Sequence, residues 1–81
     1  MYYIYAIKSL NRNYIYVGMT KNLDDRLFRH NNGYEKTTKP YAPFELIYTE
    51  EAEDGKKARA REKYLKSGVG KEFLKPLNTA K

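Results

Sequence analysis

No cysteine occurs in the 81-residue chain, so neither a disulfide nor a thiolate zinc site can reinforce its core. Its apolar stretches are only as long as strands and are interrupted by polar residues, which indicates no signal peptide and no membrane span. A chain of this length also leaves no room for a second core. We therefore expect one small domain over residues 1–81, monomeric by default, in a cytoplasmic protein with no membrane partner.

Basic and aromatic residues are what the chain has in excess. Nine tyrosines and three phenylalanines supply bulk for a small core, and a tyrosine can pack its ring while its hydroxyl stays wet. Lys and Arg outnumber Asp and Glu by 16 to 10, which gives a formal net charge of +6 and a pI near 9.5. This balance favours a polyanionic partner, although a basic surface that binds nothing in particular is an ordinary alternative.

Two short stretches of alternating residues predict an antiparallel β-hairpin. Residues 2–7 and 14–17 alternate as half-buried strands do, and Gly18 is expected to end the second strand. Tyr5 and Tyr16 should share one face of this hairpin. Its other face should carry a core of Ile4, Ala6, Ile15 and Val17.

A helix is predicted over Leu23–His30, directly after the hairpin. Asn22 precedes it as an N-cap, and Asp25 lies three residues further on as the reciprocal partner of a capping box. Arg26 and His30 lie one turn apart, on a row that borders the apolar stripe of this helix. Ionisable side chains beside a buried stripe indicate a specific role.

The second half of the chain predicts one more strand and two helices. We expect the strand over residues 44–49, a helix that opens with the acidic residues 50–54 and ends near Lys66, and a short helix over residues 71–75. On the longer helix, Glu62 falls on the inward stripe, where an apolar residue is expected.

Several residues keep the order and spacing of the motifs of one known family: Tyr3-Ile4-Tyr5, Tyr16-Val17-Gly18, Arg26, His30, Glu62 and Asn78. This pattern resembles the GIY-YIG endonuclease domain over essentially the whole chain. It is most similar to the small stand-alone members, which are related to the catalytic module of the bacterial excision-repair incision subunit. The resemblance implies an α+β fold with a three-stranded antiparallel sheet flanked by helices, in the order strand, strand, helix, strand, helix and a last short helix.

The chain departs from the family pattern at three positions. Tyr3 stands where the first motif has glycine, and Val17 replaces the isoleucine of the second motif with a residue of similar shape. Met19 stands where some members carry a lysine, for which Lys21 is the candidate substitute. If the missing glycine serves close approach of substrate, the phenol of Tyr3 narrows access. This favours the alternative of a module that binds nucleic acid without cleaving it.

The resemblance implies roles for five of these residues in phosphodiester hydrolysis. Tyr5 and Tyr16 would position or deprotonate the attacking water, and Arg26 would stabilise charge on the phosphate. His30 would be base, proton relay or phosphate donor, and Asn78 would orient the substrate or Glu62. The structural alternatives are packing tyrosines, an arginine covering apolar surface, a structural histidine and an ordinary tail asparagine.

Glu62 is the implied ligand of a divalent cation, Mg²⁺ or Mn²⁺, because hard cations prefer carboxylate oxygens and keep several waters. The alternative is a glutamate that forms an ion pair with Arg26 or another basic side chain.

Candidate contacts to nucleic acid are basic side chains distributed over the chain: Lys21, Arg29, Lys36, Lys39, Arg61 and Lys63. The same charges also suit a solvated surface. No stretch of the sequence is typical of a helix that reads bases, so we expect selectivity for nucleic-acid shape. The expected substrate is structured DNA in repair or recombination, with delivery by another protein left open.

Overall fold

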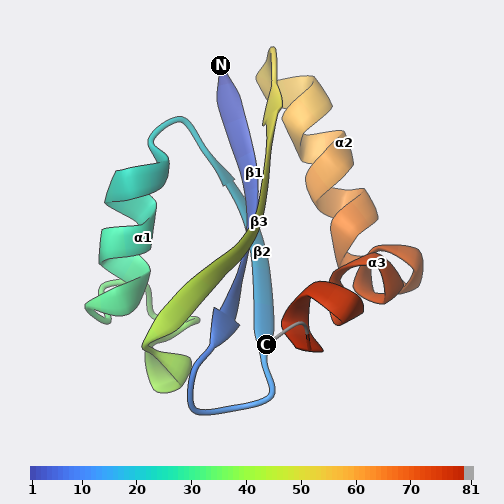
Figure 1. Cartoon of the computed structure of the whole chain (residues 1–81). Helices are drawn as coiled ribbons and strands as arrows, with labels where there is room; N and C mark the ends of the chain where they lie inside the picture. Colours follow the sequence, from blue (N-terminus) through green and yellow to red (C-terminus); the bar gives the residue numbers. More distant parts are fainter. Residues whose placement is uncertain (80–81) are drawn as a thin grey trace.

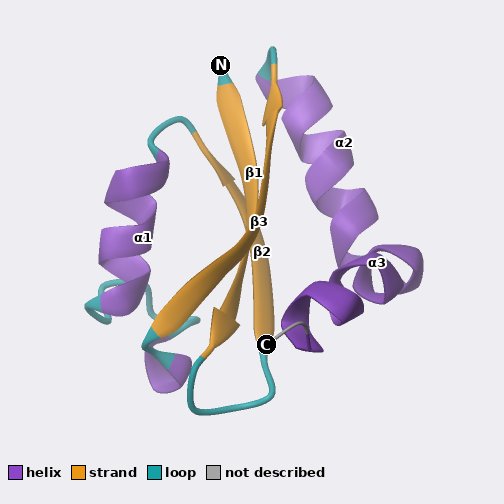
Figure 2. Cartoon of the chain, in the orientation of Figure 1, coloured by secondary structure: helices purple, strands orange, loops and turns teal. Residues whose placement is uncertain are grey.

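The structure, a computed structural model, describes the backbone of residues 1–79 and the side chains of residues 1–75. The strands are β1 (Tyr2–Ser9), β2 (Ile15–Thr20) and β3 (Phe44–Ala52), and the helices are α1 (Leu23–Asn31), the short 3₁₀ helix η1 (Lys39–Tyr41), α2 (Gly55–Lys66) and α3 (Gly68–Thr79). The three strands form one antiparallel sheet in the order β2-β1-β3 (Figures 1 and 2). The predicted α+β fold is therefore confirmed.

Helices cover both faces of the sheet. In Figure 1, α1 lies on one side of the sheet and α2 and α3 lie on the other. The side facing α2 and α3 has a core of Ile4, Ala6, Val17, Ala58, Leu65 and Leu74. The side facing α1 has a smaller core of Tyr5, Ile7 and Phe44, with Tyr16, Leu23 and Leu27 packed against it. The predicted division of the hairpin into an aliphatic face and a tyrosine face is confirmed.

Gly18 does not end β2, contrary to the prediction, because the strand continues to Thr20. Gly18 pairs with Tyr5 of β1, and a Cβ atom at this position would lie 2.7 Å from the Tyr5 hydroxyl oxygen. The glycine is required by this close approach of an aromatic side chain rather than by a turn.

Asn22 caps α1 as predicted, since its side chain accepts a 3.0 Å hydrogen bond from the Asp25 amide. The reciprocal half of the capping box is replaced by another contact: the Asn22 amide donates to the Thr20 hydroxyl oxygen at 3.0 Å. The first turn thus depends on the end of β2 as well as on α1.

The predicted start of the second long helix was wrong. Glu50 and Glu51 belong to β3, which pairs with β1 as far as Ala52, and α2 begins only at Gly55 after the N-cap Asp54. Pairing with β1 therefore prevails over the preference of acidic residues for a helix N-terminus. A bulge in β3 opposite Ala6 and Ile7 also shifts the register, so the alternation of its side chains is interrupted there.

The last helix is longer than predicted. It begins at Gly68, where the Ser67 hydroxyl oxygen accepts a hydrogen bond from the Gly70 amide at 3.3 Å, and it continues to Thr79. Pro76 removes one backbone donor without ending the helix. Leu74, which is 1% exposed, fixes α3 against the core.

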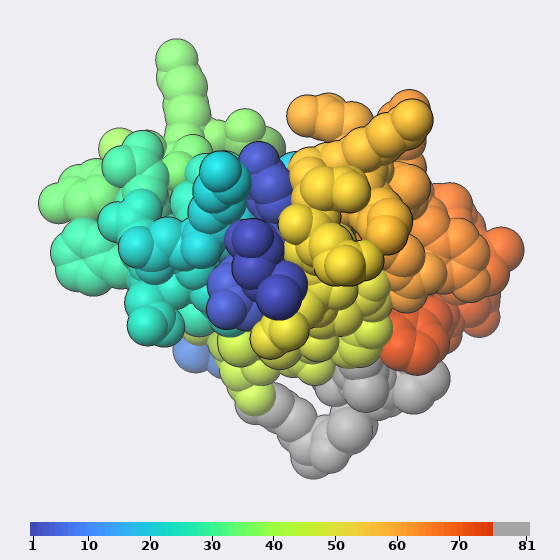
Figure 3. All heavy atoms as spheres, turned by 90° about the horizontal axis from the view of Figure 1, so that it is seen from above, coloured from blue at the N-terminus to red at the C-terminus, as the bar shows by residue number. Residues whose placement is uncertain are grey.

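A view from above shows the beginning of β1 at the surface, between the α1 side and the end of β3 with the start of α2 (Figure 3). None of the helices in the described part of the chain has the length and apolar character needed to cross a membrane.

Candidate active site

A chain of buried hydrogen bonds begins at Tyr5. The Tyr5 hydroxyl and His30 Nε2 lie 2.8 Å apart, and His30 Nδ1 lies 2.8 Å from the Thr38 hydroxyl oxygen. All three residues are at most 1% exposed. The Thr38 hydroxyl also lies 3.4 Å from the Glu35 carbonyl oxygen, to which it can donate. This assigns the Nδ1 proton to His30, so that Nε2 accepts from Tyr5.

Burial keeps both members of the Tyr5–His30 pair neutral. It lowers the pKa of His30, an effect that the Glu35 carboxylate opposes and the Arg26 and Arg29 guanidinium groups reinforce. Burial also raises the pKa of Tyr5 far above its usual value, and the nearby charge of Arg26 offsets this only in part. Tyr5 therefore holds its proton and is suited to fixing geometry.

Arg26 enters the site from α1 with its charge incompletely paired. Its Nε is buried, and within the described residues it is the one buried side-chain nitrogen or oxygen with no hydrogen-bond partner. The nearest Glu35 carboxylate oxygen is 3.8 Å away, whereas Arg29 binds the same oxygen at 2.8 Å. The hydrogen bond from Arg29 is also the main cause of the lowered pKa of Glu35. Arg26 Nε can therefore donate a hydrogen bond to an incoming acceptor such as a phosphate oxygen.

Tyr16 faces Tyr5 across the two paired strands. Its ring centroid lies 6.4 Å from that of Tyr5 and 5.1 Å from that of His30. A Cβ atom at Gly18 would meet both phenol rings, at 2.8 Å from Tyr5 Cζ and 3.0 Å from Tyr16 Cε2. Tyr5 is fully buried and Tyr16 only partly, so Tyr16 is the phenol that water can reach.

Glu62 reaches the same site from α2. Its side chain is 17% exposed and forms a 3.4 Å ion pair with Lys66, one turn later, while Arg26 pairs with Glu35. The ammonium group of Lys66 lies 5.7 Å from the centroid of the Tyr16 ring. The Glu62 charge is the smallest of the causes that raise the pKa of Tyr5, and Lys66 is the residue that links Glu62 to Tyr16. The structure thus brings together Tyr5, Tyr16, Gly18, Arg26, His30 and Glu62, which with Lys66 are called the candidate site below.

The candidate site offers a single carboxylate to a metal ion. The described residues contain no cluster of three or more His, Cys, Asp or Glu side chains that would enclose one. A hard cation such as Mg²⁺ does not need such a cluster, since it usually keeps several waters and takes one or two carboxylates together with substrate phosphate oxygens. Glu62 fits this donor set if Lys66 releases it.

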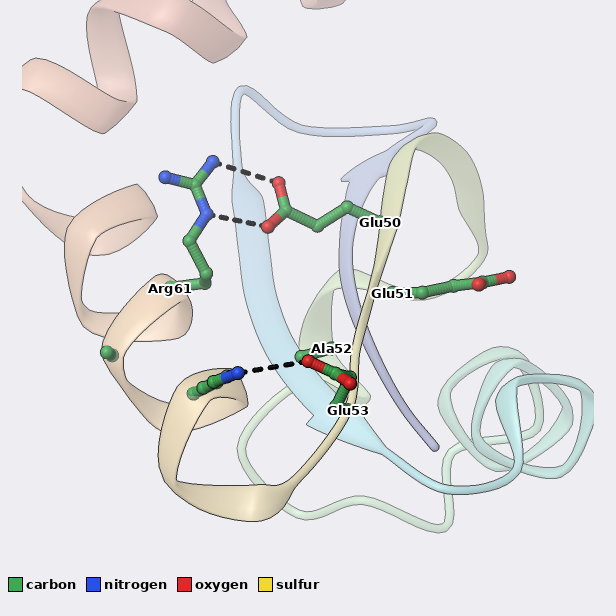
Figure 4. A pocket seen from close by; sticks show the side chains of 7 residues that line it. Glu50, Glu51, Ala52, Glu53 and Arg61 are labelled. Atoms are coloured by element: carbon green, nitrogen blue, oxygen red, sulfur yellow. Dashed lines mark hydrogen bonds and ion pairs between the residues drawn. The ribbon is translucent and has the colours of Figure 1, made fainter.

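Arg61 does not reach the candidate site. Its guanidinium donates to both carboxylate oxygens of Glu50, at 2.6 and 2.9 Å, and this carboxylate comes from β3, at the sheet edge opposite β2 (Figure 4). Lys57 binds Glu53 beside this pair at 3.0 Å. A hollow of about 480 Å³ lies here, which we call the acidic pocket. Its charged lining residues are Glu50, Glu51, Glu53, Lys57 and Arg61.

The other predicted contacts to nucleic acid are scattered over the surface. Arg29 is paired with Glu35, and the Lys21 ammonium lies 5.2 Å from the centroid of the Tyr2 ring. The remaining three are exposed lysines: Lys36, Lys39 and Lys63. The side chain of Asn78 lies outside the described residues, so its predicted role is not addressed.

Three residues of this region were not assigned to the site from the sequence. Lys66 reaches Tyr16 only through packing of α2 against the hairpin, and nothing in its sequence spacing indicates this. Nothing in the sequence around Thr38 indicates a role in the site either. Glu35 could have been singled out, because it is the one acidic residue in the otherwise neutral and basic stretch 34–43.

Comparison with known proteins identifies the family to which the chain belongs. A sequence model of the GIY-YIG catalytic domain matches residues 1–78. A UPF0213 protein of Clostridium perfringens is 39% identical over 67 residues, which cover 82% of this chain and 71% of that protein. A UPF0213 protein of Staphylococcus saprophyticus is 33% identical over 75 residues, covering 91% of this chain and 90% of its own length. No solved structure matches significantly. The family match over nearly the whole chain, together with these relatives, shows that the protein belongs to the GIY-YIG family.

Proposed function

We propose that this chain is a metal-dependent endonuclease that hydrolyses phosphodiester bonds in structured DNA. Membership of the GIY-YIG family implies nuclease-type activity with nucleic acid as substrate. The need for Mg²⁺ or Mn²⁺, the choice of DNA and a place in repair or recombination are our proposals. The observation that carries the proposal is the buried Nε of Arg26, which lacks a hydrogen-bond partner beside two tyrosines and a histidine.

Arg26 is proposed to bind the phosphate whose bond is cleaved. A guanidinium offers several donors in a planar fork, and one of these is unsatisfied here. Charge on the phosphate oxygens changes as water attacks phosphorus and the bond to the leaving oxygen breaks. A fixed donor that is already desolvated stabilises this charge without reorganisation of solvent.

Tyr16 is proposed to hold the attacking water, and Tyr5 to hold Tyr16. The Lys66 ammonium lies 5.7 Å from the Tyr16 ring centroid and adds positive charge where an anionic substrate would meet this phenol. Tyr5 donates a hydrogen bond to His30 Nε2 and fills the space beside Gly18. His30 is accordingly assigned a positioning role through Tyr5.

Glu62 is the residue that would hold the metal ion. When bound, Mg²⁺ or Mn²⁺ supplies Lewis-acid stabilisation of charge on the phosphate and the leaving oxygen. Lys66 must then give up its contact with the Glu62 carboxylate, and its exposed position allows this.

Selectivity for structure rather than sequence is proposed from the distribution of charge. Arg29 and Arg61 are occupied by Glu35 and Glu50, and the lysines that remain exposed suit backbone contacts. Such contacts recognise the path of phosphates, and a branch or nick changes that path.

The test is a cleavage assay with branched, nicked, duplex and single-stranded DNA, and with matched RNA strands. Each substrate is incubated with Mg²⁺, with Mn²⁺ and with EDTA. We expect cleavage of branched or nicked DNA that EDTA abolishes. Equal cleavage in EDTA would refute the metal requirement, and cleavage of RNA alone would refute the choice of DNA.

A non-catalytic module that binds nucleic acid is the second candidate function, and the Glu62–Lys66 ion pair favours it. This pair neutralises the carboxylate that a metal ion would need. Binding of the same substrates without cleavage under any metal condition would establish this alternative.

A further inference from the structure

A groove of about 900 Å³ lies beside the candidate site, between β2 and the helices α2 and α3. One wall is formed by residues 13–17, and the other by the end of α2 and by Lys71, Glu72, Leu74 and Lys75 of α3. Because β2 is an edge strand, its outer backbone groups are not used by the sheet. The groove therefore offers polar backbone groups along one wall and helical side chains along the other.

Positive charge dominates the groove. Lys66, Lys71 and Lys75 line it, with Glu72 as the acidic lining residue. Lys71 and Lys75 are one helical turn apart on α3, and both are exposed. Neither was among the predicted contacts to nucleic acid, because the sequence alone does not show that α3 faces β2.

The groove and the candidate site share two residues. Tyr16 and Lys66 line the groove, and they are also the residues whose ring and ammonium group lie 5.7 Å apart in the site. A polyanion bound at Arg26 and Tyr16 can therefore continue past Lys66 along α3. A space of this size is in the range of small-ligand pockets, which admits a short run of one strand but not a duplex.

We propose that this groove binds the sugar-phosphate backbone of a single nucleic-acid strand next to the bond to be cleaved, with Lys71 and Lys75 as phosphate contacts. The proposal rests on the proposed nucleic-acid substrate of the same site. The lysines favour this occupant over a peptide that would add to the edge of β2. Tyr16 also lines the groove and adds an aromatic surface of the kind on which bases stack, whereas the Tyr14 ring is already stacked on Tyr41.

The experiment measures the affinity of the full chain for a short single-stranded oligothymidylate in EDTA, at several salt concentrations. Lys71→Glu should weaken binding about 10-fold and reduce the log–log salt slope by about one. The matched control is Lys56→Glu, an exposed lysine in the first turn of α2, at the other end of that helix from the groove. It should weaken binding by less than about 2-fold, as expected for a charge distant from the bound strand.

Thermal unfolding shows whether each variant is folded, and Lys71→Gln replaces Lys71→Glu if the charge reversal destabilises the protein. NMR titration of the wild type should shift the amides of residues 13–17 and 71–75. Equal losses for the Lys71 and Lys56 variants would overturn the proposal. So would an oligonucleotide that leaves these amides unmoved, or a β-strand peptide that shifts them when the oligonucleotide does not.

Cleavage with Mg²⁺ is measured separately, so that the two proposals fail differently. If the oligonucleotide binds in the groove but no substrate is cleaved, the nuclease proposal fails and the groove stands. If the wild type cleaves DNA and Lys71→Glu binds as tightly as Lys56→Glu, the groove proposal alone fails.

Discussion

The candidate site and the acidic pocket contain the same kinds of side chains but pair them differently. In the acidic pocket, Arg61 donates two short hydrogen bonds to Glu50. These bonds compensate for the loss of water around the partly buried carboxylate. In the candidate site, Arg26 has a buried Nε with no partner and a carboxylate only at 3.8 Å. Both arginines come from helices packed on the sheet, so the difference lies in their partners.

This difference separates an arginine that holds the fold from one available to a ligand. A satisfied bidentate pair has little left to offer an anion, and its hydrogen bonds dominate the raised pKa of Arg61 and the lowered pKa of Glu50. An unsatisfied buried donor costs folding free energy, and the charge that develops on a phosphate in the transition state can compensate for this cost. We therefore interpret the acidic pocket as structural and the candidate site as the region proposed to act on the substrate.

Substitution of Glu62 in the candidate site and of Glu50 in the acidic pocket should give the largest difference in cleavage rate. Glu62→Gln removes the charge that a hard cation needs, so cleavage should fall about 10³-fold or more, on the scale of several kcal/mol of metal stabilisation. Glu50→Gln should leave cleavage nearly intact and lower stability by about 1 kcal/mol at most, since the pair is partly exposed. Single-turnover rates and thermal unfolding of both variants measure this.

Metal binding gives the control for that prediction. Mn²⁺-induced broadening of NMR signals near Glu62 should disappear in Glu62→Gln and persist in Glu50→Gln. Unchanged broadening in Glu62→Gln would contradict the ligand assignment.

Two glycines, one in the candidate site and one at the start of α2, should differ in how much an alanine substitution changes stability. Gly18→Ala places a Cβ atom 2.7 Å from the hydroxyl of the fully buried Tyr5, so we expect a loss of about 1–3 kcal/mol from overpacking. Gly55→Ala meets Tyr2 at an ordinary 3.4 Å at the start of α2. It should be neutral or stabilising by up to about 1 kcal/mol. Chemical denaturation compares them, and equal effects would show that Tyr5 is not held tightly.

Acidification should destabilise the protein through its single histidine, His30. The pKa of His30 is lowered by burial in the folded protein, whereas the unfolded chain takes up a proton near pH 6.5. Below that pH the folded state binds fewer protons, so its stability increases with pH across this window, by at most about 1.4 kcal/mol per pH unit. Urea denaturation at several pH values from about 6.5 downward measures this change in the free energy of unfolding.

His30→Gln is the control for the pH dependence, because glutamine does not titrate. Its free energy of unfolding should vary less with pH than that of the wild type over the same window. A wild-type stability that is flat, or that rises on acidification, would show that His30 accepts a proton in the folded protein.

The sequence predicted the parts of the site that depend on local periodicity. Alternation in the hairpin placed Tyr5 and Tyr16 on one face, and helical spacing placed Arg26 and His30 on adjacent turns. It also placed Glu62 on the inward stripe of α2, and the side chain is 17% exposed there. These predictions succeeded because each concerns residues within one element or one hairpin.

The features that the sequence did not predict are set by contacts between elements. The bulge in β3 and the inclusion of Glu50 in that strand follow from pairing with β1. The position of Lys66 over Tyr16 follows from the packing of α2 beside β2. The partner of Arg26 was also missed, because Glu35 lies in a loop with no periodic pattern.

Kinetics and binding of two arginine variants test the contrast between the candidate site and the acidic pocket most directly. Arg26→Ala should lower the single-turnover cleavage rate about 10²-fold or more while the dissociation constant for DNA changes less than about 3-fold. Arg61→Ala should lower the rate by less than about 3-fold and mainly reduce stability. Equal rate losses in the two variants, or a loss of affinity in Arg26→Ala that accounts for its whole effect, would contradict a role for Arg26 in the transition state.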